Sequence, residues 1–307
     1  MAIVISGASG HLARLISEEL VRAVPASDLI LVTRTPEALA DWAARGARVV
    51  HGDHRSAESL RLAYQGGDRL MLISGLAIGK RVAEHANAIE AAKAAGIAHI
   101  TYTSVAGPHP RNPTPSAADH VGTERLLWAS GLGFAALRNQ MYAELLYDMV
   151  VDTALPTGRW LHVGDTGRIA PVSRSDIAAS ATAILLAPDQ HDRVTYELTG
   201  PERFSFRQIA ALASKLFRQP IDYTPVSADA LYAELDAAGL PRKGLPDSDI
   251  IPVRFGSDEL VQSFVAYDQG YHDILSSHVE YLTGRKPKSL ADVLAGEIAR
   301  RFQTSGH

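Results

Sequence analysis

The residues with the clearest chemical potential stand at the start of the chain, in Gly7-Ala-Ser-Gly-His-Leu-Ala13. Glycines let a backbone turn tightly and approach a phosphate, and the first amides of a following helix offer it unpaired N–H groups. The spacing is Gly-x-x-Gly-x-x-Ala, so the apolar run before the turn and the helix after it carry the prediction of a dinucleotide pyrophosphate site. The alternative is a glycine turn without a ligand. The residues expected at the cofactor here are Gly7, Ser9, Gly10, His11 and Leu12.

Two further residues bear on which dinucleotide binds. An NAD site usually places an acid after the second strand to bind the ribose 2′-hydroxyl, whereas an NADP site offers a cation to the 2′-phosphate. The second apolar run, 29–33, is followed by Arg34, which favours NADP, taken up as NADPH. The alternative is a solvated surface arginine. Asp53 follows the third run, where its carboxylate could accept from the adenine amino group.

These residues are positioned by an alternation of strands and helices. Strands are expected at 2–6, 29–33, 48–50, 69–73, 99–103 and 133–137, and helices at 14–24, 37–46, 56–65, 80–95 and 118–130. The alternation predicts an α/β fold with a doubly wound parallel (Rossmann) sheet, whose ligands lie at the carboxyl ends of the strands. The later strand ends add Ser74, Gly75, Thr103 and Ser104 to the expected cofactor residues.

The pattern loosens in the second half of the chain. Helices are expected at 141–153, at 205–217, 228–238 and 257–268, and in an alanine-rich segment that Ser175 or Asp176 caps and that ends at 187; a late strand is expected at 194–198. We therefore predict an NAD(P)-binding Rossmann domain over 1–152. Residues 153–307 would return late strands to the sheet and form a smaller, mostly helical substrate cap. The proline-rich loop 107–116 should border the pocket, together with Met141, Tyr142 and Trp160.

The composition excludes several classes of function. A net charge of −4 with interspersed signs gives no footprint for nucleic acid, and no apolar stretch approaches the length of a membrane span. With 0 cysteines, thiolate chemistry is excluded. His51 and His54 flank Asp53 without a third convincing ligand, so no metal is expected. A cytoplasmic protein is predicted; the oligomeric state is left open, with a homodimer as one option.

Several segments resemble the NmrA-like family of atypical short-chain dehydrogenases/reductases. They are Gly7-Ala-Ser-Gly-His-Leu, Thr33-Arg-Thr-Pro, Asn87-Ala-Ile-Glu-Ala-Ala-Lys-Ala-Ala-Gly-Ile, Tyr102-Thr-Ser and Leu137-Arg-Asn. Within the family the chain looks most like the type 2 NAD(P)H:quinone oxidoreductases, with the triphenylmethane reductases as relatives. The resemblance extends to about Asp249, and 250–277 looks longer than in the quinone reductases.

The resemblance raises a question about the catalytic residues. Ordinary short-chain dehydrogenases use a tyrosine with a lysine four residues later, and none of the 10 tyrosines here has that partner. At the corresponding place stands His120-Val-Gly-Thr-Glu124, similar to the quinone reductases. We nominate His120 and Tyr142 for proton donation or substrate orientation, and Asn139 as a polar anchor near the nicotinamide. Alternatively, His120 caps a helix or pairs with Glu124, and Tyr142 is a core aromatic residue.

The absence of the usual acid favours an acceptor that solvent can protonate after hydride transfer. The leading hypothesis is an NADPH-dependent reductase acting on a quinone or similar conjugated aromatic acceptor. One alternative is a non-catalytic NAD(P)-binding redox sensor of the NmrA type. Another is an aryl ether or ketone reductase related to the lignan and isoflavone reductases, for which Lys80 is the candidate lysine. An open apolar space above the nicotinamide would favour an enzyme, whereas a sensor can fill that space with side chains.

Overall fold

A seven-stranded sheet forms the centre of the molecule, seen in a computed structural model that describes residues 1–245 and 251–304. Its order is β3-β2-β1-β4-β5-β6-β9, and all neighbouring strands are parallel. The predicted doubly wound sheet is therefore confirmed. The strands are β1 (Ile3–Ser6), β2 (Leu29–Thr33), β3 (Arg48–His51), β4 (Arg69–Leu72), β5 (His99–Val105), β6 (Gly133–Asn139) and β9 (Val194–Leu198).

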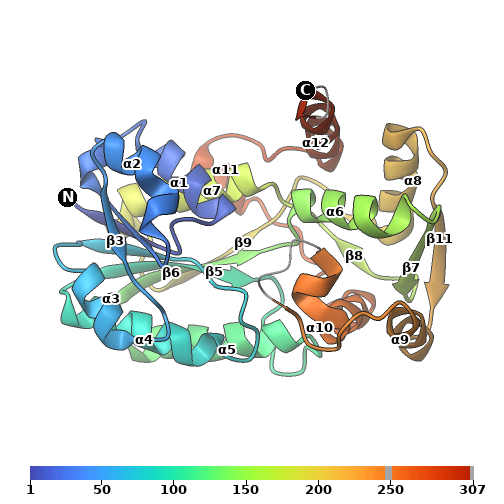
Figure 1. Cartoon of the computed structure of the whole chain (residues 1–307), viewed down its shortest axis with the longest axis horizontal. Helices are drawn as coiled ribbons and strands as arrows, with labels where there is room; N and C mark the ends of the chain where they lie inside the picture. The colour runs from blue at the N-terminus through green and yellow to red at the C-terminus, as the bar shows by residue number, and fades with distance from the viewer. Residues whose placement is uncertain (246–250, 305–307) are drawn as a thin grey trace.

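Helices cover both faces of this sheet (Figure 1). Ile3 and Ile5 pack toward one face and Val4 toward the other, because successive side chains of a strand alternate between faces. Both faces are thus apolar, as expected of a parallel sheet between two helical layers. One layer holds α1 (His11–Leu20), α7 (Arg174–Leu186) and α11 (His278–Thr283), and the other α3 (Ala57–Ala63), α4 (Arg81–Ala94) and α5 (Pro115–Ala129); the short α2 (Ala40–Ala44) follows β2.

The C-terminal half adds a second apolar core beyond the carboxyl ends of the strands (Figure 1). Trp160, Phe206, Phe264 and Tyr267 lie in this core. Its elements are α6 (Ala143–Met149) with a π-helical turn (Val150–Ala154), the parallel pair β7 (Arg159–Val163) and β11 (Asp222–Val226), the antiparallel pair β8 (Arg168–Ile169) and β10 (Phe204–Ser205), and helices α8 (Phe206–Phe217), α9 (Ala228–Ala237), α10 (Ile251–Asp268) and α12 (Leu290–Thr304).

The late strand β9 returns to the main sheet beside β6, as predicted. Helix α11 also returns, packing on α7 and β9. The predicted division near residue 153 remains a prediction. Within the described part of the chain, no helix combines the length and the apolar character needed to cross a bilayer.

Some helix starts differ from the sequence-based prediction. The helix after the glycine turn begins at His11 instead of residue 14, and α5 begins at Pro115 instead of 118. A proline fits the first turn of a helix, because the N–H group it lacks would have no partner there. Helix α7 is capped by Ser173, whose side chain accepts from the Asp176 backbone N–H, so the prediction of Ser175 or Asp176 as the cap was wrong.

Candidate cofactor and acceptor site

A cavity of about 950 Å³ lies at the carboxyl ends of the main strands. Strand ends and the loops after them form one side, and α10 contributes Phe255, Glu259 and Leu260 to the other. The structure brings all the predicted site residues to this one cavity. They are Gly7, Ser9, Gly10, His11, Leu12, Arg34, Asp53, Ser74, Gly75, Thr103, Ser104, His120, Asn139 and Tyr142.

The turn after β1 has the geometry that a pyrophosphate requires. Gly7 adopts a φ of +83°, in the left-handed region that favours glycine. Its N–H donates to the Val32 carbonyl at 3.0 Å, which holds the turn against β2. Gly10 caps α1 without any side-chain hydrogen bond to the first turn of the helix. The first amides of α1 therefore face the cavity as donors for an anion.

The end of β2 presents a cation. Thr33 Oγ1 donates to Ser9 Oγ at 3.0 Å, which ties the end of β2 to the glycine turn. The side chain of Arg34 is exposed at the cavity wall and, within residues 1–245 and 251–304, makes no hydrogen bond or ion pair. Residues 34–36, which follow β2 directly, include no carboxylate that could receive a ribose 2′-hydroxyl. The arrangement fits a 2′-phosphate.

Asp53 lies at the same end of the cavity and is already paired. Its Oδ2 is 2.5 Å from Arg55 Nη2, and its Oδ1 is 3.0 Å from Arg55 Nε. The hydrogen bonds from Arg55 lower the pKa of Asp53 to about 2. A carboxylate retains lone pairs beyond these bonds, so it can still accept from an amino group of the adenine.

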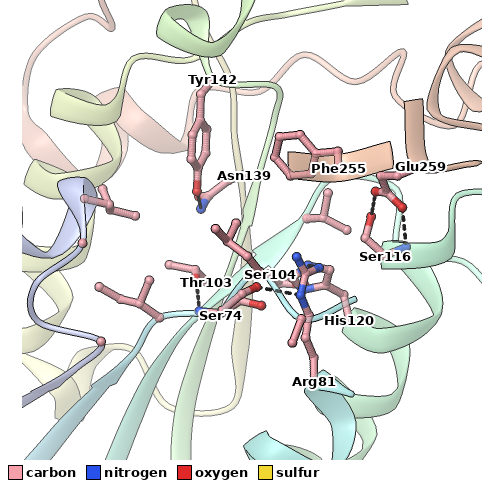
Figure 2. A pocket seen from close by; sticks show the side chains of 18 of the residues that line it. Ser74, Arg81, Thr103, Ser104, Ser116, His120, Asn139, Tyr142, Phe255 and Glu259 are labelled. Carbon is pink, nitrogen blue, oxygen red and sulfur yellow. Dashed lines mark hydrogen bonds between the residues drawn. The ribbon is translucent and has the colours of Figure 1, made fainter. Parts of the chain in front are cut away.

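The other half of the cavity gathers hydroxyl and amide groups from β4, β5 and β6 (Figure 2). Thr103 Oγ1 accepts from the Ser74 backbone N–H at 2.8 Å. Asn139 Nδ2 donates to the Tyr142 hydroxyl at 3.3 Å. Asn139 Oδ1 is buried and receives no hydrogen bond from any residue that the structure describes. This carbonyl oxygen could accept from a carboxamide in the cleft.

His120 lines this half of the cavity but is itself buried. Its Nδ1 lies 2.7 Å from the Tyr102 hydroxyl, and its Nε2 lies 3.4 Å from Arg81 Nη1. Burial and the neighbouring charge of Arg81 hold the pKa of His120 well below its usual range. Because a guanidinium only donates, Nε2 accepts and Nδ1 carries the ring proton. His120 is thus a neutral ring with both nitrogens occupied.

Neither alternative role of His120, as a helix cap or as a partner of Glu124, fits the structure. His120 lies inside α5, and Glu124 pairs instead with Arg138 at 2.7 Å. Glu124 also accepts a hydrogen bond from Ser104 Oγ at 2.7 Å, so it anchors the end of β5.

Arg81 and Glu259 are among the charged residues of the cavity wall that sequence reasoning missed. Arg81 begins α4, one position after Lys80, which is exposed at the same wall. Glu259 comes from α10, and its carboxylate accepts from the Ser116 backbone N–H at 3.0 Å and from the Ser116 hydroxyl. Burial raises the pKa of Glu259. The only sequence signal for Arg81 was its position after the fourth strand.

The prediction of which other residues line the cavity is confirmed in part. Met141 and Tyr142 line the cavity, as do Asn112 and Thr114 of the proline-rich loop, but the prediction for Trp160 was wrong. Trp160 is 2% exposed and packs in the second core, because β7 turns its ring toward Phe206.

Among the described residues, no three His, Asp or Glu side chains gather as a metal site would require.

Comparisons with known proteins agree with this geometry. Residues 7–188 match a family model described as NAD(P)H-binding. Quinone oxidoreductase 2 from Escherichia coli is 35% identical over 251 residues, which is 81% of this chain and 87% of that protein.

Two solved structures share the whole fold. The structure of the NADPH-dependent quinone oxidoreductase QOR2 of Escherichia coli complexed with NADPH matches with a TM-score of 0.86 at 32% identity, covering 96% of this chain and 99% of that one. Triphenylmethane reductase of Citrobacter sp. complexed with NADP(H) matches with a TM-score of 0.82 at 26% identity, covering 97% and 99%. The chain belongs to the NAD(P)H-binding family, as a relative of quinone oxidoreductase 2.

Proposed function

We propose that this protein is an NADPH-dependent reductase that transfers hydride to a quinone or a similar conjugated aromatic acceptor. The observation that carries the proposal is the open cavity, which continues beyond the dinucleotide-binding turn to the space beneath α10. The name and the NADPH complex of the Escherichia coli relative support the same reading.

The residues of the cavity fit NADPH along its length. The first amides of α1 would hold the pyrophosphate, Arg34 the 2′-phosphate and Asp53 the adenine amino group. The Asn139 carbonyl oxygen would accept from the nicotinamide carboxamide, beside Ser74 and Thr103. NADPH supplies the hydride when it is bound, so the protein contributes orientation and a suitable acceptor site.

The acceptor half of the cavity suits a flat apolar molecule. Apolar side chains from α6, from the segment just before it and from α10 line this half, in addition to the polar groups at the strand ends. The apolar residues are Met141, Leu145, Phe255, Leu260 and Phe264. Held against the nicotinamide, a quinone needs no dedicated protein acid, because water can protonate the reduced oxygen. Open space here favours an enzyme over a non-catalytic sensor.

The proposal is tested by following NADPH oxidation with benzoquinones, naphthoquinones and aryl ketones as acceptors. Wild-type protein should reduce quinones faster with NADPH than with NADH. Arg34→Ala should raise the KM for NADPH by about ten- to a hundredfold, because a charge-assisted hydrogen bond to phosphate is lost, and should leave the KM for NADH nearly unchanged. Arg22→Ala is the matched control. It removes an exposed arginine that forms an ion pair with Glu19 away from the cavity.

Other results would favour the alternatives. Tight NADPH binding in calorimetry with no turnover of any acceptor would replace the reductase by the sensor. Oxidation of NADPH by aryl ketones, without oxidation by quinones, would favour the aryl reductase that uses Lys80.

A further inference from the structure

Arg81 places a buried positive charge in the wall of the acceptor half of the cavity. Only 6% of this residue is exposed. Its Nε donates to the Gly75 carbonyl at 2.7 Å, and its Nη1 lies 3.4 Å from His120 Nε2. Figure 2 shows the side chain reaching from the start of α4 toward Ser104 and His120. Within residues 1–245 and 251–304, no carboxylate forms an ion pair with it.

A buried guanidinium without a counter-ion is costly, because taking a charge out of water must be offset by a partner of opposite sign. Two other arginines near this cavity are offset in that way. Arg138 pairs with Glu124 at 2.7 Å and with Glu197 at 3.2 Å, and Arg55 pairs with Asp53. Among the described residues, the hydrogen-bond partners of Arg81 are instead neutral: the Gly75 carbonyl and the His120 ring. The compensating anion is therefore expected from a ligand.

The groups around Arg81 fix its direction without neutralising it. His120 is neutral and is held by the Tyr102 hydroxyl, so its Nε2 can orient the guanidinium. The carboxylate of Glu259 faces the same cavity, and the charge of Arg81 acts on its pKa. Among the described residues, however, Glu259 forms no ion pair with Arg81, and its oxygens accept from Ser116. Figure 2 shows the Glu259–Ser116 contact to one side of Arg81.

We propose that Arg81 is the oxyanion-binding residue of the acceptor site, with His120 as the residue that positions it. This inference rests on the proposed reductase function and narrows its substrates to acceptors whose reduction leaves a negative charge on oxygen, as in quinones. A quinone that gains a hydride from NADPH carries two more electrons and one more proton, and is then a hydroquinone monoanion. Arg81 binds the anionic oxygen, and one proton from water completes the hydroquinone.

The test uses 4-nitrophenol as a probe that cannot be turned over, with the protein saturated in NADP⁺. The phenolate absorbs visible light and the neutral phenol does not, so a titration reports the pKa of the bound probe. Wild-type protein should lower that pKa by about one unit relative to free 4-nitrophenol, since a charge-assisted hydrogen bond strengthens phenolate binding about tenfold. Arg81→Met should abolish the shift, and Arg81→Lys should restore part of it.

Lys93→Met is the matched control, because it removes one exposed cation from the same helix and should keep the wild-type shift. The affinity of each variant for NADP⁺ shows whether the fold and the cofactor half are intact. An unchanged phenolate shift in Arg81→Met would overturn the inference. If that unchanged shift came with an NADP⁺ affinity weakened about tenfold, Arg81 would serve the cofactor instead.

The probe separates this inference from the proposed function. Quinone reduction by a wild-type protein that leaves the pKa of 4-nitrophenol unchanged would refute the oxyanion site and leave the reductase standing. A shifted pKa in a protein that reduces no quinone would support the anion site and refute the reductase.

Discussion

At the scale of single residues, the side-chain amide of Asn139 uses one of its N–H groups and leaves its carbonyl oxygen free for a ligand. Its Nδ2 donates to the Tyr142 hydroxyl at 3.3 Å, whereas its Oδ1 is buried without a donor among the residues described. An unsatisfied buried acceptor costs free energy, which a ligand that donates to it would recover. Tyr142 is then a support for Asn139, and burial raises the pKa of its hydroxyl.

This arrangement predicts different effects for two substitutions. Asn139→Ala should weaken NADPH binding about tenfold, because one hydrogen bond to the carboxamide is lost. Tyr142→Phe should weaken it less than about threefold, since the amide keeps its place without the long bond from Nδ2. Fluorescence titration with NADPH measures both. A larger loss in Tyr142→Phe than in Asn139→Ala would show that the tyrosine hydroxyl itself contacts the ligand.

The cavity residues divide into those that sequence could place and those it could not. Arg34, Asp53, Ser74 and Asn139 follow or end strands, and the carboxyl ends of parallel strands meet at one edge, so their gathering was predictable. Arg81 was not identified, because what distinguishes it is that it is buried and has no ion-pair partner in the part of the chain that the structure describes. A sequence shows that an arginine is present but does not show which charges lie beside it after folding.

At the scale of elements, α10 is held over the cavity by a contact between residues 143 positions apart. Glu259 accepts from the backbone N–H and the hydroxyl of Ser116, in the first turn of α5. A carboxylate at a helix N-terminus is favoured by the unpaired amides and by the helix dipole. The periodicity of apolar residues within α10 or α5 cannot reveal a contact between the two helices. The sequence therefore predicted a helical cap but not the hydrogen bonds that hold it over the cavity.

Glu259→Gln should therefore loosen α10. The neutral amide keeps one acceptor but loses the charge-assisted bonds, at a cost of about 1–2 kcal/mol. Hydrogen exchange followed by mass spectrometry should show faster exchange in α10 and at the start of α5, with β1 and β4 unchanged. Asp258→Asn is the control, because this neighbouring carboxylate is exposed and forms a long pair with Arg242 at 3.9 Å. Equal exchange in both variants would mean that apolar packing alone holds the helix.

At the scale of the whole molecule, the main sheet and most helices of the second core were predictable, and the strand pairs of the second core were not. The strands of the sheet are apolar runs separated by helices, a pattern that a parallel sheet imposes on the whole sequence. In the second core, β8 and β10 have two residues each, and β7 pairs with β11 across 58 residues that include α7 and α8. Strands this short carry too little periodicity to be recognised.

The molecule also buries several histidines in neutral form, in both cores. Burial lowers the pKa of His85 and of His162 to about 3 and that of His272 to about 4. In the unfolded chain each would have a pKa near 6.5. Above about pH 6.5 these histidines are neutral in both the folded and the unfolded protein, and they do not lower the free energy of unfolding. As the pH falls below that value, the unfolded chain binds protons that the folded protein does not bind, so the free energy of unfolding decreases. Below that pH, each such histidine lowers the free energy of unfolding by up to about 1.4 kcal/mol per pH unit.

His162 gives the cleanest test, because it is stacked between Phe206 and Phe264 at centroid distances of 3.8 and 3.9 Å, away from the cofactor residues. His162→Phe keeps an aromatic ring there and removes the titrating group. Between about pH 6.5 and pH 5.5, its free energy of unfolding in urea should fall by about 1 kcal/mol less than that of the wild type. Buried carboxyl groups such as Glu259, whose pKa is raised, titrate with the opposite sign in both proteins and cancel in the difference. Parallel pH profiles would mean that His162 accepts a proton in the folded protein, and the second core would then have to admit water.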